Sequence, residues 1–249
     1  MNSVPATSIK VDGDLRAPSP DASFWLCGLL QAGDSFYPTG SYAHSFGLEG
    51  LVQEGVVRDR DTLRQFLTLS VLPALQHVEL PLAIHAWQAL GERDWTRVGE
   101  LARLSSALKT PREARLASEN IGRQRAELAA GLRAAPLAQE YLARAATERW
   151  PFSSSISAAL EGRVLGAPRD AVLSAVTYAA LAGILSAAMK LLRLGQNASQ
   201  LLLTEMLREA PALIAAAEKI PFDEIGWFNP WLDIAAARHE TADTRMFIS

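Results

Sequence analysis

The four histidines are the residues of this chain best suited to chemistry, because imidazole serves both as a general base and as a metal ligand. They are His44, His77, His85 and His239. No two of them have the i,i+4 spacing of a helical metal site, and none ends a Glu-x-x-His unit. Eight positions and Pro81 separate His77 from His85, which disfavours a shared ion. The sequence therefore predicts no metal site in this chain.

A serine nucleophile is the second possibility. The segment Tyr42-Ala43-His44-Ser45 places a base beside Ser45, and Ser41 is three residues from the histidine. Neither an oxyanion-hole loop nor a third member of a catalytic triad is evident. A small hydrolase is kept as an alternative, but the preferred interpretation is a chain that is not an enzyme.

Phosphate-binding patterns are missing as well. The chain contains neither Gly-x-Gly-x-x-Gly nor the P-loop pattern. Arginine is frequent between residues 94 and 149, but glutamate is interleaved with it and no aromatic residues alternate with the arginines to stack on bases. The net charge of −3 gives no positive field for nucleic acid or anionic lipid. We therefore expect neither nucleotide binding by this chain alone nor nucleic-acid binding.

The cysteine count and the apolar segments bear on the compartment. The single cysteine, Cys27, cannot form an internal disulfide, which fits the reducing cytoplasm, and its apolar neighbours predict that it is buried. The first residues show no secretory signal. Residues 171–189 carry no charge and are long enough to span a membrane. Their content of alanine, serine and glycine favours instead a buried helix of a soluble protein.

The elements that position these residues are expected to be helices. Alanine, leucine and arginine dominate, runs of β-branched residues are almost absent, and there is no alternating strand pattern. Pro73, Pro81 and Pro211 should interrupt or kink the helices that contain them. We predict an all-α, single-domain helical bundle of about eight to ten helices. Its parts are a flexible N-terminal arm at 1–22, the helical domain at 23–232 and a C-terminal partner-binding tail at 233–249.

Two clusters of polar and aromatic residues, at 34–49 and 230–249, suggest binding surfaces in a chain without a catalytic pattern. The first belongs to the run LLQAGDSFYPTGSYAHSFGLE from Leu29 to Glu49. It combines a leucine-rich strip, the turn Pro38-Thr39-Gly40, an aromatic residue and a Ser-x-Gly-Leu-Glu element. This run resembles the opening signature of the UreF family of urease accessory proteins.

Three further elements strengthen the resemblance, which covers residues 26–249. The chain end, with Arg238-His239-Glu240 and Arg245-Met246-Phe247-Ile248-Ser249, is similar to the tail of that family. Lys109–Arg115 with Gly122-Arg123-Gln124 resembles its central elements, and Ser186–Leu191 its Ser-Ala-x-Arg-Leu helix. The chain departs from the family pattern at three positions. These are Lys190 in place of arginine, Met246 in place of leucine, and Phe46 in place of glycine or a small residue.

The resemblance implies a non-catalytic scaffold. Such a protein would act with a second accessory protein, UreD (also called UreH), and the GTPase UreG to support GTP-dependent nickel insertion into apo-urease. It would be a homodimer, with no tightly bound cofactor of its own, because nickel is handled by the complex. An unrelated helical adaptor for another GTPase or enzyme is the alternative. The partner-binding residues implied by the resemblance are Tyr37, Pro38, Thr39, Gly40, Tyr42, His44, Ser45, Glu49, Arg238, His239, Glu240, Arg245, Phe247 and Ser249.

Two structural expectations follow. The tail from about Asp233 should be mobile or loosely docked in the free protein, because so short a segment is marginal alone and Phe247 and Ile248 need a partner to be buried. Removing residues 245–249 should then leave the fold nearly unchanged. The second expectation is that the small residues of the helix from Ala171 to Leu194 form part of the dimer interface.

Overall fold

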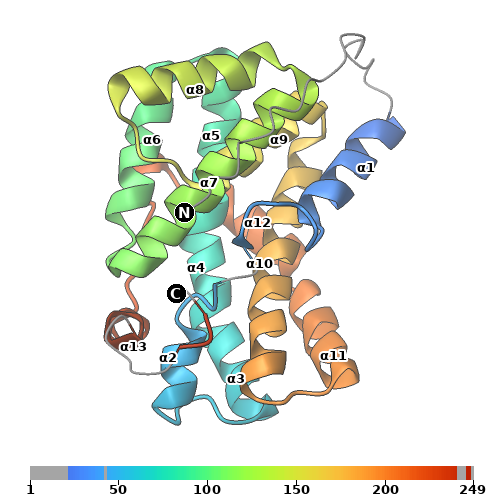
Figure 1. Cartoon of the computed structure of the whole chain (residues 1–249), viewed down its shortest axis with the longest axis vertical. Helices are drawn as coiled ribbons and strands as arrows, with labels where there is room; N and C mark the ends of the chain where they lie inside the picture. Colours follow the sequence, from blue (N-terminus) through green and yellow to red (C-terminus); the bar gives the residue numbers. More distant parts are fainter. Residues whose placement is uncertain (1–21, 42–43, 240–244, 248–249) are drawn as a thin grey trace, which may run out of the picture.

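The computed structural model describes residues 22–41, 44–239 and 245–247, and every regular element in these ranges is helical (Figure 1). There are 11 helices, 10 of which have seven or more residues, when the continuous segment 60–92 is counted once. The all-α prediction is confirmed. The predicted arm at 1–22 falls, except for Ala22, outside the described residues.

Most helices follow one another after a few residues, and the longest connections are 34–47 and 218–229. In chain order they are α1 (Ala22–Gly33), α2 (Leu48–Gln53), α3 (Arg60–Phe66), α4 (Leu72–Ala74), α5 (Leu80–Glu92), α6 (Trp95–Ala107), α7 (Arg112–Arg133), α8 (Pro136–Glu148), α9 (Ser154–Leu165), α10 (Arg169–Leu191), α11 (Gln196–Leu207), α12 (Ala210–Ala217) and α13 (Pro230–His239).

The segment from α3 to α5 is one 33-residue helix, although it contains two prolines. Two π-helical turns, Leu67–Val71 and Leu75–Glu79, come just before Pro73 and Pro81. A proline cannot donate the usual backbone hydrogen bond and its ring crowds the preceding turn, and a wider turn relieves both constraints. The predicted interruption is thus absorbed inside the helix. At Pro211 the prediction is closer, because α11 ends at Leu207 and α12 begins at Ala210.

This long helix joins two apolar cores. Its first half, with Phe66, Leu67 and Leu75, packs in a cluster with α2, α10, α11 and α12. Its second half contributes Leu82 and Leu90 to another cluster, which α6, α7, α8 and α9 complete. In Figure 1, α6 and α8, which contribute to the second cluster, lie in the upper half of the molecule, and α2 and α11, which contribute to the first, lie in the lower half.

Helix α1 packs on α9 and α10 through the face that carries Trp25 and Leu29, which lie against Leu165 and Val172. Cys27 lies outside that face and is exposed, so the prediction that it is buried was wrong. An apolar run cannot show which of its residues face inward when the helix packs along one side only.

Two helical segments are long and apolar enough to cross a membrane by length and composition, Arg60–Glu92 and Arg169–Leu191. The second is the predicted segment 171–189. Both are packed inside the bundle, where α10 contacts α5, α9, α11 and α12. The core helix of a soluble protein passes the same test of length and composition, so neither segment is evidence for a membrane span.

Candidate partner-binding site

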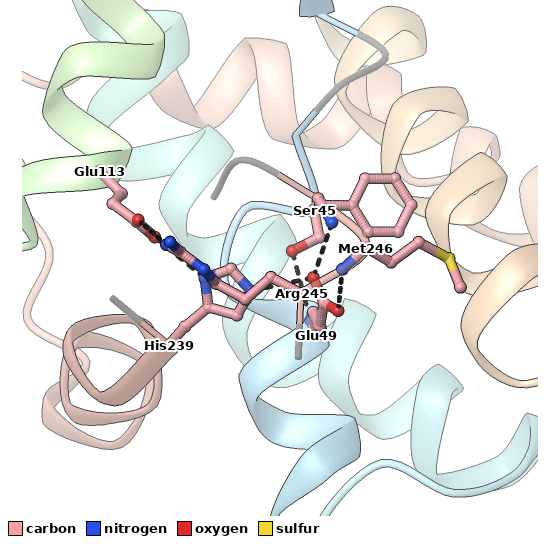
Figure 2. A network of polar contacts seen from close by, with 7 residues as sticks. Ser45, Glu49, Glu113, His239, Arg245 and Met246 are labelled. Atoms are coloured by element: carbon pink, nitrogen blue, oxygen red, sulfur yellow. Dashed lines mark hydrogen bonds and ion pairs between the residues drawn. The ribbon is translucent and has the colours of Figure 1, made fainter. Parts of the chain in front are cut away.

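The carboxylate of Glu49 is the centre of the site. It lies in the first turn of α2, is only 3% exposed, and belongs to the predicted set. Its Oε1 accepts a hydrogen bond from the backbone N–H of Met246 at 2.7 Å, and its Oε2 accepts one from that of Phe247 at 3.0 Å. The ring nitrogen Nε2 of His239 lies 2.9 Å from the same Oε2 (Figure 2). One buried carboxylate therefore holds the end of the chain through two backbone groups and a side chain.

A second carboxylate, that of Glu113 in the first turn of α7, extends the cluster. Its Oε2 lies 2.9 Å from Nδ1 of His239, and its Oε1 accepts a hydrogen bond from the guanidinium of Arg245 at 2.7 Å. Figure 2 shows His239 and Arg245 reaching from α13 and the tail toward these two carboxylates. The tail is thereby tied to two helices that are about 60 residues apart in sequence.

Close backbone packing supports the docking of α13 on α2. A Cβ atom built on Gly50 would lie 2.6 Å from the carbonyl oxygen of Ala235, so only glycine allows the two helices to approach this closely. Arg238 adds a surface ion pair, 2.9 Å from Glu54. Helix α13 begins at Pro230 and so runs across the predicted domain boundary at 232/233.

Phe247 is buried by its own chain. Its side chain is 6% exposed, belongs to the lower apolar cluster, and has the ammonium of Lys190 5.3 Å from its ring centroid. The prediction that Phe247 needs a partner for burial was wrong, because charged residues around it, and Glu49 above all, already fix the backbone that carries it. The expectation that removing residues 245–249 leaves the fold nearly unchanged loses its basis, since Glu49 would lose two donors. Ile248 lies outside the described residues.

The turn before α2 has its own anchors. The Tyr37 hydroxyl donates to the buried carboxylate of Glu161 on α9 at 2.6 Å, and burial together with this carboxylate raises the pKa of Tyr37. Gln124 of α7 is placed to donate its side-chain amide to the Pro38 and Thr39 carbonyls, at 2.9 and 2.8 Å. Gly40 has a φ of 77°, in the region that favours glycine. This turn is therefore held by α7 and α9. It is separate from the tail cluster, which is the group formed by Ser45, Glu49, Glu113, His239, Arg245, Met246 and Phe247.

The surroundings of Ser45 do not suit a nucleophile. Ser45 is fully buried, and its Oγ accepts a hydrogen bond from the backbone N–H of Glu49 at 3.3 Å. Burial lowers the pKa of His44, an effect that Glu113 opposes. Phe46, which follows, has a φ of 53° and Gly47 one of 86°. Left-handed backbone at position 46 explains why glycine suits this position in the family pattern.

Sequence comparison decides the family. The profile of the UreF family matches residues 57–207, more than half of the chain. The chain belongs to the UreF family. It is a urease accessory protein that takes part in urease maturation and is not itself an enzyme. No group of three or more histidine, cysteine, aspartate or glutamate side chains in the described part of the chain is arranged to hold a metal ion.

Several curated UreF proteins are similar over nearly the whole chain. The urease accessory protein UreF of Azoarcus sp. (strain BH72) is 34% identical over 227 residues, which cover 90% of this chain and 95% of the relative. That of Methylibium petroleiphilum is 31% identical over 239 residues, with 94% and 98% covered. That of Bacillus sp. (strain TB-90) is 26% identical over 224 residues, with 90% and 99% covered.

The structure brings together only part of the set that the UreF resemblance implied. Ser45, Glu49, His239, Arg245 and Phe247 meet in the tail cluster, whereas the turn from Tyr37 to Gly40 is anchored elsewhere. Tyr42, Glu240 and Ser249 lie outside the described residues. Sequence reasoning missed three polar residues that hold these segments. They are Glu113, which lies inside the segment Lys109–Arg115, Gln124 of the Gly-Arg-Gln element, and Glu161, a lone acid in an apolar helix.

Proposed function

We propose that this UreF-family chain is a cytoplasmic, homodimeric scaffold that binds UreD (UreH) and recruits the GTPase UreG, so that the assembly inserts nickel into apo-urease in a GTP-dependent step. Nickel is the cargo of the complex and not a resident ion of this chain. The observation that carries the proposal is the tail cluster, in which Glu49 and Glu113 hold a chain end that the family resemblance assigns to partner binding.

The surface around the docked tail supports this proposal. Helix α13 and the segment before it expose a group of large apolar side chains, which includes Phe228 and Trp231, the latter 79% exposed. Large exposed aromatic side chains are typical of protein–protein contact sites. Docking by Glu49 and His239 fixes α13, and with it the direction in which these aromatic residues point. In this proposal the tail cluster presents α13 to UreD, and the other implied residues act by holding the tail and the turn.

Replacing Trp231 with alanine tests the proposal. A tagged chain is produced in cells that carry the urease genes, and co-purification of UreD and UreG is measured together with urease activity. A buried interface tryptophan contributes about 2 kcal/mol or more to the free energy of binding, so co-purification of UreD and UreG should fall about thirtyfold or more. The control is Leu201→Ala on α11, which removes another well-exposed side chain, 59% exposed, from a different face. Equal retention of partners by both variants would contradict the proposal.

The homodimer is proposed to use α10. One side of this helix is incompletely buried and presents small residues, among them Ser174, Ala182 and Gly183, and a Cβ built on Gly183 meets no atom within 4 Å. Light scattering of the isolated chain should therefore give a dimer mass, and Gly183→Arg should give a monomer, because arginine fits the free surface and blocks close helix approach. Gly131→Arg on α7, where a Cβ is equally unobstructed, should leave the dimer intact. A wild-type monomer would remove this proposal.

A further inference from the structure

Both ring nitrogens of His239 face carboxylates. Nε2 lies 2.9 Å from Oε2 of Glu49, and Nδ1 lies 2.9 Å from Oε2 of Glu113. The histidine side chain is 2% exposed, so water does not replace either contact. The ring bridges α2 and α7 while it belongs to α13 (Figure 2).

A neutral imidazole cannot make both contacts as hydrogen bonds. It carries one N–H, and its other nitrogen is an acceptor, as are all the oxygens of an ionised carboxylate. The unprotonated nitrogen would then face a carboxylate oxygen lone pair at 2.9 Å in a buried place, where such a contact is unfavourable. An imidazolium donates from both nitrogens and makes two charge-assisted hydrogen bonds.

Placing the extra proton on a carboxylate instead of the ring fits the contacts less well. Both oxygens of Glu49 already accept backbone hydrogen bonds, from Met246 and Phe247. Oε1 of Glu113 accepts from the guanidinium of Arg245. Each of these bonds is strongest when the acceptor is ionised, so the arrangement favours two carboxylates and a protonated ring.

The other charged groups around the ring agree with this assignment. Helix α2 contributes Glu49, α7 contributes Glu113 and the tail contributes Arg245, while the nearby His44, on the loop before α2, is buried. Among the described residues, these two carboxylates face the guanidinium of Arg245 and the ring, and a protonated ring balances their charge. On α13 itself, Arg238 is paired with Glu54 at the surface.

We infer that His239 is a positioning residue that works as an imidazolium, and that its proton fastens the tail to α2 and α7. A ring without the extra proton has only one N–H, so one of its two contacts with a carboxylate is no longer a hydrogen bond and docking weakens. The tail cluster is therefore a pH-sensitive attachment for the chain end, whichever partner later binds there.

Nuclear magnetic resonance of the full-length chain with 15N-labelled histidine and backbone tests this inference without any substitution. At about pH 6, one ring should show both nitrogens in the imidazolium range. As the pH is raised to about 9, the amide signals of Met246 and Phe247 should shift along the titration curve of that same ring. A neutral tautomer at the acidic end would overturn the inference. So would tail amides that stay unchanged while the ring titrates.

Three variants sharpen the test. His239→Gln removes the charge, so amide-exchange protection of Met246 and Phe247 should fall about tenfold at acidic pH and lose its pH dependence, after correction for intrinsic exchange. His239→Arg keeps a forked cation that can reach two carboxylates, and should retain protection at all pH values. His85→Gln, which removes a partly buried histidine bonded to the Ile220 carbonyl at 3.0 Å, should leave the pH dependence as in the wild type. A wild-type pH profile in His239→Gln would also overturn the inference.

Discussion

Replacing Glu49 with glutamine should lower the free energy of unfolding by about 3–5 kcal/mol, the range found when one partner of a buried ion pair is removed. The carboxylate accepts from the backbone N–H groups of Met246 and Phe247, and Nε2 of His239 lies 2.9 Å from its Oε2. A glutamine side chain has nearly the same shape, but its amide nitrogen is a donor and would face donors. The remaining oxygen cannot satisfy all three groups, and the buried His239 ring loses one of the two carboxylates that it faces. Urea denaturation followed by circular dichroism measures the loss.

The matched control is Glu54→Gln, just beyond the same helix. Glu54 pairs with Arg238 at 2.9 Å, but the guanidinium side chain is 70% exposed. Exposed pairs contribute about 0–1 kcal/mol, so this substitution should change the free energy of unfolding little. If both variants lost the same small amount, the tail would not be held by Glu49, and the buried cluster would have no part in fixing α13.

The class of fold was predictable because it depends on local properties. Helix-forming composition, the spacing of apolar residues and the absence of strand patterns all report on neighbouring residues. The course of the chain through Pro73 and Pro81 was not predictable to the same degree. Whether a proline breaks a helix or is absorbed by a π-helical turn depends on the packing of the helix on both sides.

The candidate site was predictable only in part, for a different reason. Glu49, His239 and Arg245 stand in recognisable segments, but their mutual contact depends on how α2, α7 and α13 pack. Glu113 lies in the segment Lys109–Arg115 that carries part of the family resemblance, but the pattern does not show which residue its carboxylate contacts. Glu113 is 126 positions from His239 along the chain, but in the folded protein its Oε2 lies 2.9 Å from Nδ1 of that histidine. Only the packing of the helices brings the two together.

The error over Phe247 has the same origin. A short C-terminal segment with two or three apolar residues has too little local stability to be ordered alone. What the sequence does not show is a buried carboxylate already positioned to receive its backbone N–H groups. The hydrogen bonds to Glu49 compensate for part of the conformational entropy that the tail loses on docking. The stability of the tail cannot be judged from the tail residues alone, because they do not include this contribution.

Gly122→Ala on α7 should lower the free energy of unfolding by about 3 kcal/mol, the upper part of the range for overpacked cores. A Cβ atom at this position would lie 2.5 Å from the carbonyl carbon, 2.6 Å from the carbonyl oxygen and 2.7 Å from the backbone nitrogen of Ser153. Backbone atoms cannot rotate away as a side chain can, so α7 would have to move from the start of α9. One turn earlier on α7, the Ser118 hydroxyl accepts from the backbone N–H of Ser154 at 3.3 Å, and that bond would be strained as well.

Gly131→Ala on the same helix is the control that isolates this contact. Alanine is the better helix former by about 0.5–1 kcal/mol, and a Cβ on Gly131 meets no atom within 4 Å. The same chemical change should therefore stabilise the protein at position 131 and destabilise it at position 122, as measured by urea denaturation of the two variants in parallel. The difference between them is the cost of separating α7 from α9. Because Glu113 and Gln124 lie on α7, such a displacement should also loosen both the tail cluster and the turn at Pro38 and Thr39. Stabilisation at both positions would show that α7 can shift freely, and a rigid platform for the tail would then be ruled out.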